Sequence, residues 1–131
     1  MAYLMIVDDD EDFAAATATA LVREGYEVAV KTSAAAAVPE MLSHPPDLVI
    51  LDVMFPDDDF AGLDIARAMH ESRRLKGVPI LMLTGVNPAL GMTLDSLDVD
   101  DSWMPVSDFL EKAVEPGVLI GKVKAMLKAS A

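Results

Sequence analysis

Short apolar runs and amphipathic segments alternate along the chain in a regular order. Residues 3–7 and 48–51 are unbroken apolar runs next to acidic residues, a pattern typical of strands covered on both faces. Residues 26–30 alternate as a half-buried strand does, and residues 79–83 form another apolar run. A brief strand is expected around residues 109–110. The pattern therefore predicts five strands.

Helices are predicted between these strands. The apolar positions of residues 11–24 fall on one helical face, and Gly25 stands where helices commonly stop. Ser33 is a suitable N-cap for a helix over residues 34–42, which Pro39 is expected to bend or shorten.

The second half of the chain continues the alternation. Residues 62–74 are predicted to form a helix, and Pro116 opens the last one. Pro, Gly and Asp residues interrupt residues 86–107, so only a short, marginal helix is expected there. Strand and helix thus alternate five times. This order predicts an α/β, flavodoxin-like (βα)5 doubly wound parallel sheet with strand order 2-1-3-4-5.

Length and charge narrow the class of protein. The chain has 131 residues, which we expect to form a single stand-alone domain over residues 1–131 with no room for a second one. The 22 Asp and Glu against 10 Lys and Arg give a net charge of −12. Nucleic acid and anionic membranes are therefore not expected as partners. Cysteine is absent and no apolar run could span a membrane, so a cytoplasmic location is expected.

Chemically useful residues follow the predicted strands at their carboxyl ends. They are Asp8 and Asp9, Asp52, Thr84 and Lys112. Adjacent strands lie ~4.8 Å apart, so three carboxylates would share one crevice, and two unit charges at ~5 Å repel by ~3 kcal/mol at an effective dielectric of ~20. A hard divalent cation such as Mg²⁺ would relieve this repulsion. An Asp carboxylate can accept a phosphoryl group where the surrounding charges are neutralised.

Four segments in this order resemble the receiver domains of two-component response regulators. They are Val7-Asp8-Asp9-Asp10, Leu51-Asp52-Val53-Met54 with Pro56, Thr84-Gly85, and Phe109-Leu110-Glu111-Lys112. The resemblance covers nearly the whole chain. It implies a cytoplasmic phosphorelay protein that catalyses its own aspartyl phosphorylation and dephosphorylation.

The resemblance also implies roles for single residues and for partners. Asp52 would be the phosphoacceptor, and Asp8, Asp9, Asp52 and the backbone carbonyl of Met54 would hold Mg²⁺. Thr84 and Lys112 would contact the phosphoryl oxygens, and Phe109 would be the switch aromatic. The expected partners are a histidine kinase or phosphotransfer protein and a downstream protein, with homodimerisation on phosphorylation left open.

Departures from the family pattern keep other functions open. Ala113 replaces the usual proline after Lys112, and residues 86–107 form a longer segment whose candidate anchors are Leu90, Leu94, Trp103 and Met104. Met54 and Val86, which flank the expected path of a hydrolytic water, predict a long-lived phosphoryl state. One alternative is a pseudo-receiver that binds partners without phosphorylation. A Mg²⁺-dependent phosphohydrolase is disfavoured because no second carboxylate stands two residues after Asp52.

Overall fold

The computed structural model describes residues 2–52, 61–84, 108–111 and 115–130. Five parallel strands form one sheet in the order β2-β1-β3-β4-β5, as predicted. The elements are β1 (Tyr3–Val7), α1 (Glu11–Arg23), β2 (Glu27–Lys31), α2 (Ala34–Ser43), β3 (Leu48–Asp52), α3 (Ala61–Glu71), β4 (Ile80–Thr84), β5 (Asp108–Glu111) and α4 (Pro116–Ser130). The expected marginal helix over 86–107 lies outside the described residues.

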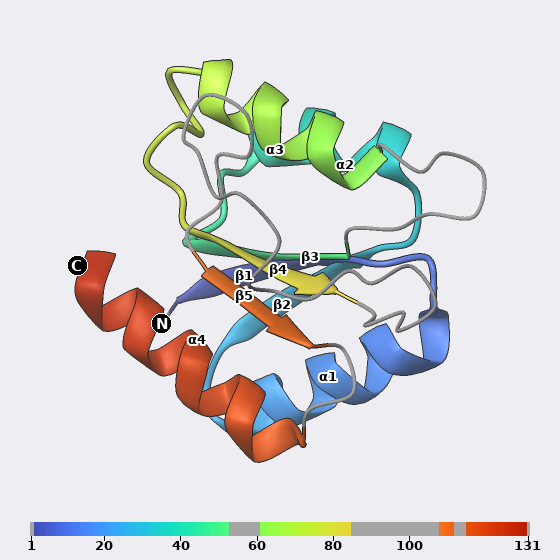
Figure 1. Cartoon of the computed structure of the whole chain (residues 1–131), viewed down its shortest axis with the longest axis vertical. Coiled ribbons are helices and arrows are strands. Elements are labelled where there is room, and N and C mark those ends of the chain that lie inside the picture. The colour runs from blue at the N-terminus through green and yellow to red at the C-terminus, as the bar shows by residue number, and fades with distance from the viewer. Residues whose placement is uncertain (1, 53–60, 85–107, 112–114, 131) are drawn as a thin grey trace, which may run out of the picture.

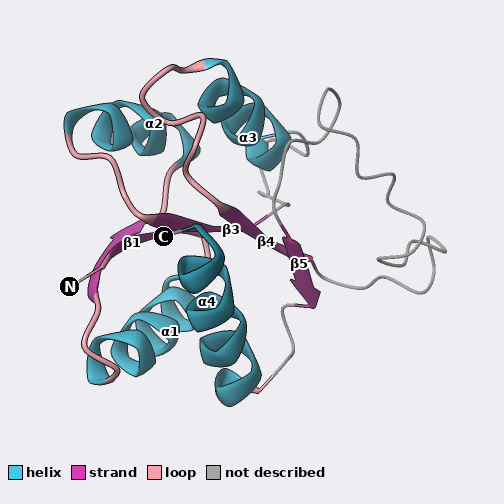
Figure 2. Cartoon of the chain, turned by 90° about the vertical axis from the view of Figure 1, so that its left-hand side faces the viewer, coloured by secondary structure: helices cyan, strands magenta, loops and turns pink. Residues whose placement is uncertain are grey.

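The helices cover both faces of the sheet. Helices α2 and α3 lie on one face, and α1 and α4 lie on the other (Figures 1 and 2). Successive strand residues point to opposite faces. Met5 and Val7 therefore pack with the first helix pair, while Leu4 and Ile6 pack with the second. This double covering explains why β1 and β3 are buried along their whole length.

Helix α2 runs over the predicted residues and one further, to Ser43, so Pro39 does not shorten it. A proline removes only one N–H donor from a helix, and the turns on either side of it are packed into the core through Ala37 and Met41. Helix α3 ends at Glu71, three residues before the predicted end. The chain turns there and buries Leu75 in the core below α2 and α3.

The termini of α1 follow from local chemistry. Asp10 is the N-cap residue, and its Oδ1 accepts the N–H of Phe13 at 3.1 Å. Glu11 and Asp12 occupy the first turn, where negative charge favours the helix dipole. Gly25 follows the helix with φ of 96°, a backbone conformation that favours glycine. These signals place the start of α1 just after the acidic residues that follow β1, and its end just before Gly25.

Candidate functional site

The strand order reverses between β1 and β3. Strand β2 lies on one side of β1, whereas β3 and then β4 lie on the other. In open α/β sheets, ligands bind beyond the carboxyl ends of the strands at such a switch point. The register pairs Val7 with Leu51, so Asp8, which follows β1, and Asp52, the last residue of β3, lie at the same level.

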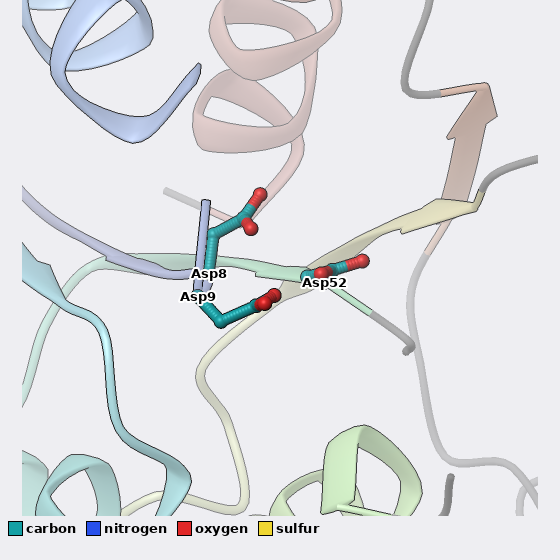
Figure 3. Close-up of side chains that lie close together, drawn as sticks. All are labelled: Asp8, Asp9 and Asp52. Carbon is teal, nitrogen blue, oxygen red and sulfur yellow. The ribbon is translucent and has the colours of Figure 1, made fainter. Parts of the chain in front are cut away.

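Three carboxylates meet at this switch point. Each of Asp8, Asp9 and Asp52 offers a carboxylate oxygen, and these oxygens all lie within 4.8 Å of one another. Figure 3 shows Asp8 and Asp9 at the end of β1 beside Asp52 at the end of β3. Asp8 is 1% exposed and Asp52 is 4% exposed, whereas Asp9 is accessible to solvent. The predicted convergence of these three residues is confirmed.

Backbone hydrogen bonds hold Asp8 in place. Its N–H donates to the carbonyl of Lys31 at 3.0 Å, which ties the end of β1 to β2. Its Oδ1 accepts the N–H of Asp10 at 2.9 Å, and Asp10 in turn caps α1. The acidic run therefore divides into two parts. Asp8 and Asp9 line the site, while the residues from Asp10 onward begin the helix.

The donor set fits a hard divalent cation. All three side chains supply carboxylate oxygens, which are the ligands that Mg²⁺ prefers, and they are arranged around one point with one side open to solvent. Three negative charges at this separation repel one another strongly, and a doubly charged ion would offset that repulsion.

The other predicted residues stand at the same end of the sheet or outside the described part. Thr84 is the last residue of β4, one beyond the residue that pairs with Asp52. Phe109 lies in β5 and pairs with Met82. Met54 and Lys112 lie outside the described residues, as do the side chains of Thr84 and Phe109. The segment carrying Leu90, Leu94, Trp103 and Met104, together with Val86 and Ala113, is outside them too.

Contacts at the opposite end of the sheet were not predicted. Asp47 precedes β3, and its Oδ2 accepts the N–H of Tyr3 at 2.7 Å. The ring of His44 stacks on the phenol of Tyr3 with the centroids 4.2 Å apart. Burial, together with the nearby charges of Glu40 and Glu27, raises the pKa of the Tyr3 phenol. His44 therefore lies at the far end of β1 from Asp8, and no local pattern in the sequence signals this pairing.

Comparison with known proteins decides the family. Residues 4–124 match the model of the response regulator receiver domain. The chain belongs to this family. Receiver domains act in two-component signalling, so this receiver domain is a component of such a system.

Relatives and solved structures agree with this assignment. The receiver domain is 30% identical to the transcriptional regulatory protein GltR of Pseudomonas aeruginosa over 95% of the chain and 48% of that protein. It is 31% identical to the DNA-binding response regulator MtrA of Mycolicibacterium paratuberculosis over 95% of the chain and 51% of that protein. The chain thus spans about half the length of the curated relatives it matches.

Two of the similar solved structures match along nearly their whole length. A CheY-like response regulator receiver domain protein from Methanospirillum hungatei superposes with a TM-score of 0.82 at 25% identity, over 99% of this chain and 96% of that chain. A response regulator from Desulfuromonas acetoxidans gives a TM-score of 0.78 at 25% identity, over 98% of both chains.

No helix in the described ranges is long and apolar enough to cross a membrane.

Proposed function

We propose that this receiver domain is a phosphorylation-dependent switch whose Asp52 accepts a phosphoryl group from a histidine kinase or phosphotransfer protein. The observation that carries the proposal is the cluster of three carboxylates around Asp52 at the switch point of a receiver fold. Asp52 belongs to β3, the central strand, and is 4% exposed, so its carboxylate has a fixed position. A fixed nucleophile is what phosphoryl transfer needs, because the reaction depends mainly on positioning and electrostatics.

The transfer step balances without a further reactant. A carboxylate oxygen of Asp52 forms a bond to phosphorus while the P–N bond of the donor phosphohistidine breaks. The electron pair of that bond returns to the imidazole nitrogen, which takes up a proton from water. The product is an acyl phosphate on Asp52.

Asp8 and Asp9 are the residues that would hold Mg²⁺ beside Asp52, together with the backbone carbonyl of Met54. The ion would supply positive charge against the phosphoryl oxygens. Thr84 and Lys112 would donate to the same oxygens, and Phe109 would transmit the change to the surface of the domain. We place this chemistry in a cytoplasmic single domain, residues 1–131. The net charge of −12 disfavours direct binding of nucleic acid by these residues.

Incubation with acetyl phosphate and Mg²⁺, followed by intact-mass measurement, tests the proposal. We expect the wild type to gain the mass of one phosphoryl group, and to gain none when a chelator replaces Mg²⁺. Asp52→Asn should gain none under either condition. Asp64→Asn is the matched control, because Asp64 lies exposed in the first turn of α3 and its loss should leave labelling unchanged.

The alternative function gives a different result. A pseudo-receiver that binds its partners without phosphorylation would stay unlabelled even where Mg²⁺ binds. A folded, Mg²⁺-binding wild type that gains no mass therefore contradicts the switch and supports the binding module.

A further inference from the structure

Strand β2 is one of the two edge strands of the sheet. Within the described residues it pairs with β1 alone. The helices lie above and below the sheet (Figure 2). Every residue of β2 is at least partly exposed, and Val30 reaches 36%, whereas β1 and β3 are buried throughout. An edge strand with this exposure presents unpaired backbone groups to another chain.

The hydrogen bonds to β1 show which backbone groups face outward. The N–H of Glu27 donates to the carbonyl of Ala2 at 2.9 Å, and the carbonyl of Lys31 accepts from Asp8 at 3.0 Å. Backbone groups alternate sides along a strand that pairs in parallel. Residues 27, 29 and 31 thus face β1, and the N–H and C=O groups of Val28 and Val30 point away from the sheet.

The sequence of this strand, Glu27-Val28-Ala29-Val30-Lys31, is self-complementary in charge and size when reversed. We propose that the β2 edge is a homodimer surface, on which a second copy of the chain pairs antiparallel about Ala29. Val28 then lies opposite Val30 of the second copy, and Glu27 lies opposite Lys31 of the second copy. This surface goes beyond the proposed phosphoryl switch, because Asp52 takes no part in it.

The register satisfies both the hydrogen bonds and the charges. Val28 and Val30 carry the outward backbone groups, so they form the hydrogen-bonded pairs of the new ladder. Glu27 and Lys31 form the closer, non-hydrogen-bonded pairs, whose side chains contact best across strands. In an antiparallel register shifted by two residues, the outward backbone groups of the two copies still pair. Glu27 then no longer lies opposite Lys31 of the second copy.

The two faces of the sheet also stay consistent. Val28 packs against the core below α1 and α4, and Lys31 approaches Glu40 of α2 on the other face. A two-fold axis that passes between the two Ala29 residues, perpendicular to the sheet, places the valines of both copies on one face and the pairs of Glu27 with Lys31 on the other. The two-fold pairing occupies the β2 edge of both copies, so this contact closes as a dimer and does not extend into a fibre.

Two features limit the affinity. The net charge of −12 makes two copies repel, and the five-residue edge is short. Lys31 also lies 4.0 Å from Glu40, but both side chains are partly exposed, so that contact competes weakly. We therefore expect weak association that is best observed near physiological ionic strength, where repulsion beyond about 8 Å is screened.

Sedimentation velocity over a concentration series up to about 1 mM, a range that detects even weak pairs, measures the association. Glu27→Lys and Lys31→Glu each place like charges opposite each other twice in the dimer, so each alone should weaken association roughly tenfold or more. An equimolar mixture of the two variants restores both ion pairs between unlike chains. The double variant Glu27→Lys with Lys31→Glu restores them between like chains.

Controls separate pairing from net charge and from misfolding. Glu71→Lys changes the net charge from −12 to −10, as Glu27→Lys does, at the exposed end of α3. It should not weaken association. Val30→Pro removes an outward N–H and should abolish pairing while the circular dichroism spectrum is unchanged. Asp52→Asn should associate like the wild type, which separates this surface from the switch.

The expected result is a wild-type dimer that either charge reversal weakens and that the mixture and the double variant restore. A misfolded variant could not restore association by mixing, so restoration reports on the pairing itself. A wild type that stays monomeric over the whole series overturns the proposal. So does association that the reversals at 27 and 31 leave unchanged.

Discussion

Replacing Asp9 by Asn removes one charge from the carboxylate cluster without changing the shape of the side chain. Its carboxylate oxygen lies within 4.8 Å of the oxygens of Asp8 and Asp52. At that distance two unit charges repel by about 3.5 kcal/mol at an effective dielectric of about 20 and by about 0.9 kcal/mol in water. Because Asp9 is accessible to solvent, its two pairs fall between these limits. We expect Asp9→Asn to raise the free energy of unfolding by about 2–3 kcal/mol when no divalent ion is present, because two pairs near the water limit sum to about 2 kcal/mol.

Urea unfolding, carried out once with a chelator and once with Mg²⁺, measures the free energy of unfolding without and with the ion. An ion that binds only the folded protein stabilises it by about 2.7 kcal/mol at one hundred times its dissociation constant. The wild type should gain stability of this order from Mg²⁺. Asp9→Asn, with one ligand oxygen replaced by a neutral amide, should lose most of that gain. The difference in free energy of unfolding between the two proteins therefore becomes smaller or changes sign when the ion is added.

Asp12→Asn is the matched control, since it removes the same charge three residues away. Asp12 is exposed in the first turn of α1, where its negative charge interacts favourably with the helix dipole. Its replacement should lower stability by about half a kcal/mol and leave the response to Mg²⁺ intact. An Asp9→Asn protein that is less stable than the wild type in chelator, and that keeps the full Mg²⁺ response, would refute the electrostatic reasoning.

Three further predictions concern local features of the fold. Asp10→Ala should destabilise the fold by about 1 kcal/mol in urea unfolding, because the N–H of Phe13 loses its cap, and Asp10→Ser should recover most of the loss. Gly25→Ala should cost about 1 kcal/mol, because φ is 96° although nothing lies within 4 Å of the added Cβ. The pKa of the Tyr3 phenol is higher in the folded protein than in the unfolded chain, so the neutral phenol favours the fold. This contribution is fully present below about pH 10 and is lost as the pH rises through the pKa of the folded state. Alkaline unfolding should therefore begin at lower pH in the wild type than in Tyr3→Phe.

Each of these has a contrary outcome. Equal stability of Asp10→Ala and the wild type would mean that the Phe13 N–H is satisfied equally well by water. A neutral Gly25→Ala would show that the chain leaves α1 in a conformation open to any residue. Coincident alkaline transitions for Tyr3→Phe and the wild type would show that the phenol ionises as readily in the folded state as in the unfolded state.

The convergence of Asp8 and Asp52 was predictable because it rests on signals that are local in the sequence. Each residue directly follows or ends an unbroken apolar run, and such runs mark strands covered on both faces. Chain order then places the two strands side by side, since right-handed crossovers leave few arrangements. The start of α1 was predictable for a similar reason, because Asp10 carries its own capping chemistry.

Other features depend on contacts between distant parts of the chain. The periodicity of α3 runs on past Glu71, but the turn that follows buries Leu75, and this burial decides where the helix ends. The bond from Tyr3 to Asp47 joins residues 44 apart, and the stack of Tyr3 on His44 accompanies it. Packing of this kind has no periodic signal and emerges only once the strands are in register.

The location of the phosphoryl group tests the central claim most directly. After reaction with acetyl phosphate and Mg²⁺, borohydride reduces an acyl phosphate and marks its residue, which peptide mass spectrometry then identifies. We predict the mark at Asp52 alone. A mark at Asp8 or Asp9, or at a residue outside the cluster, would contradict the account.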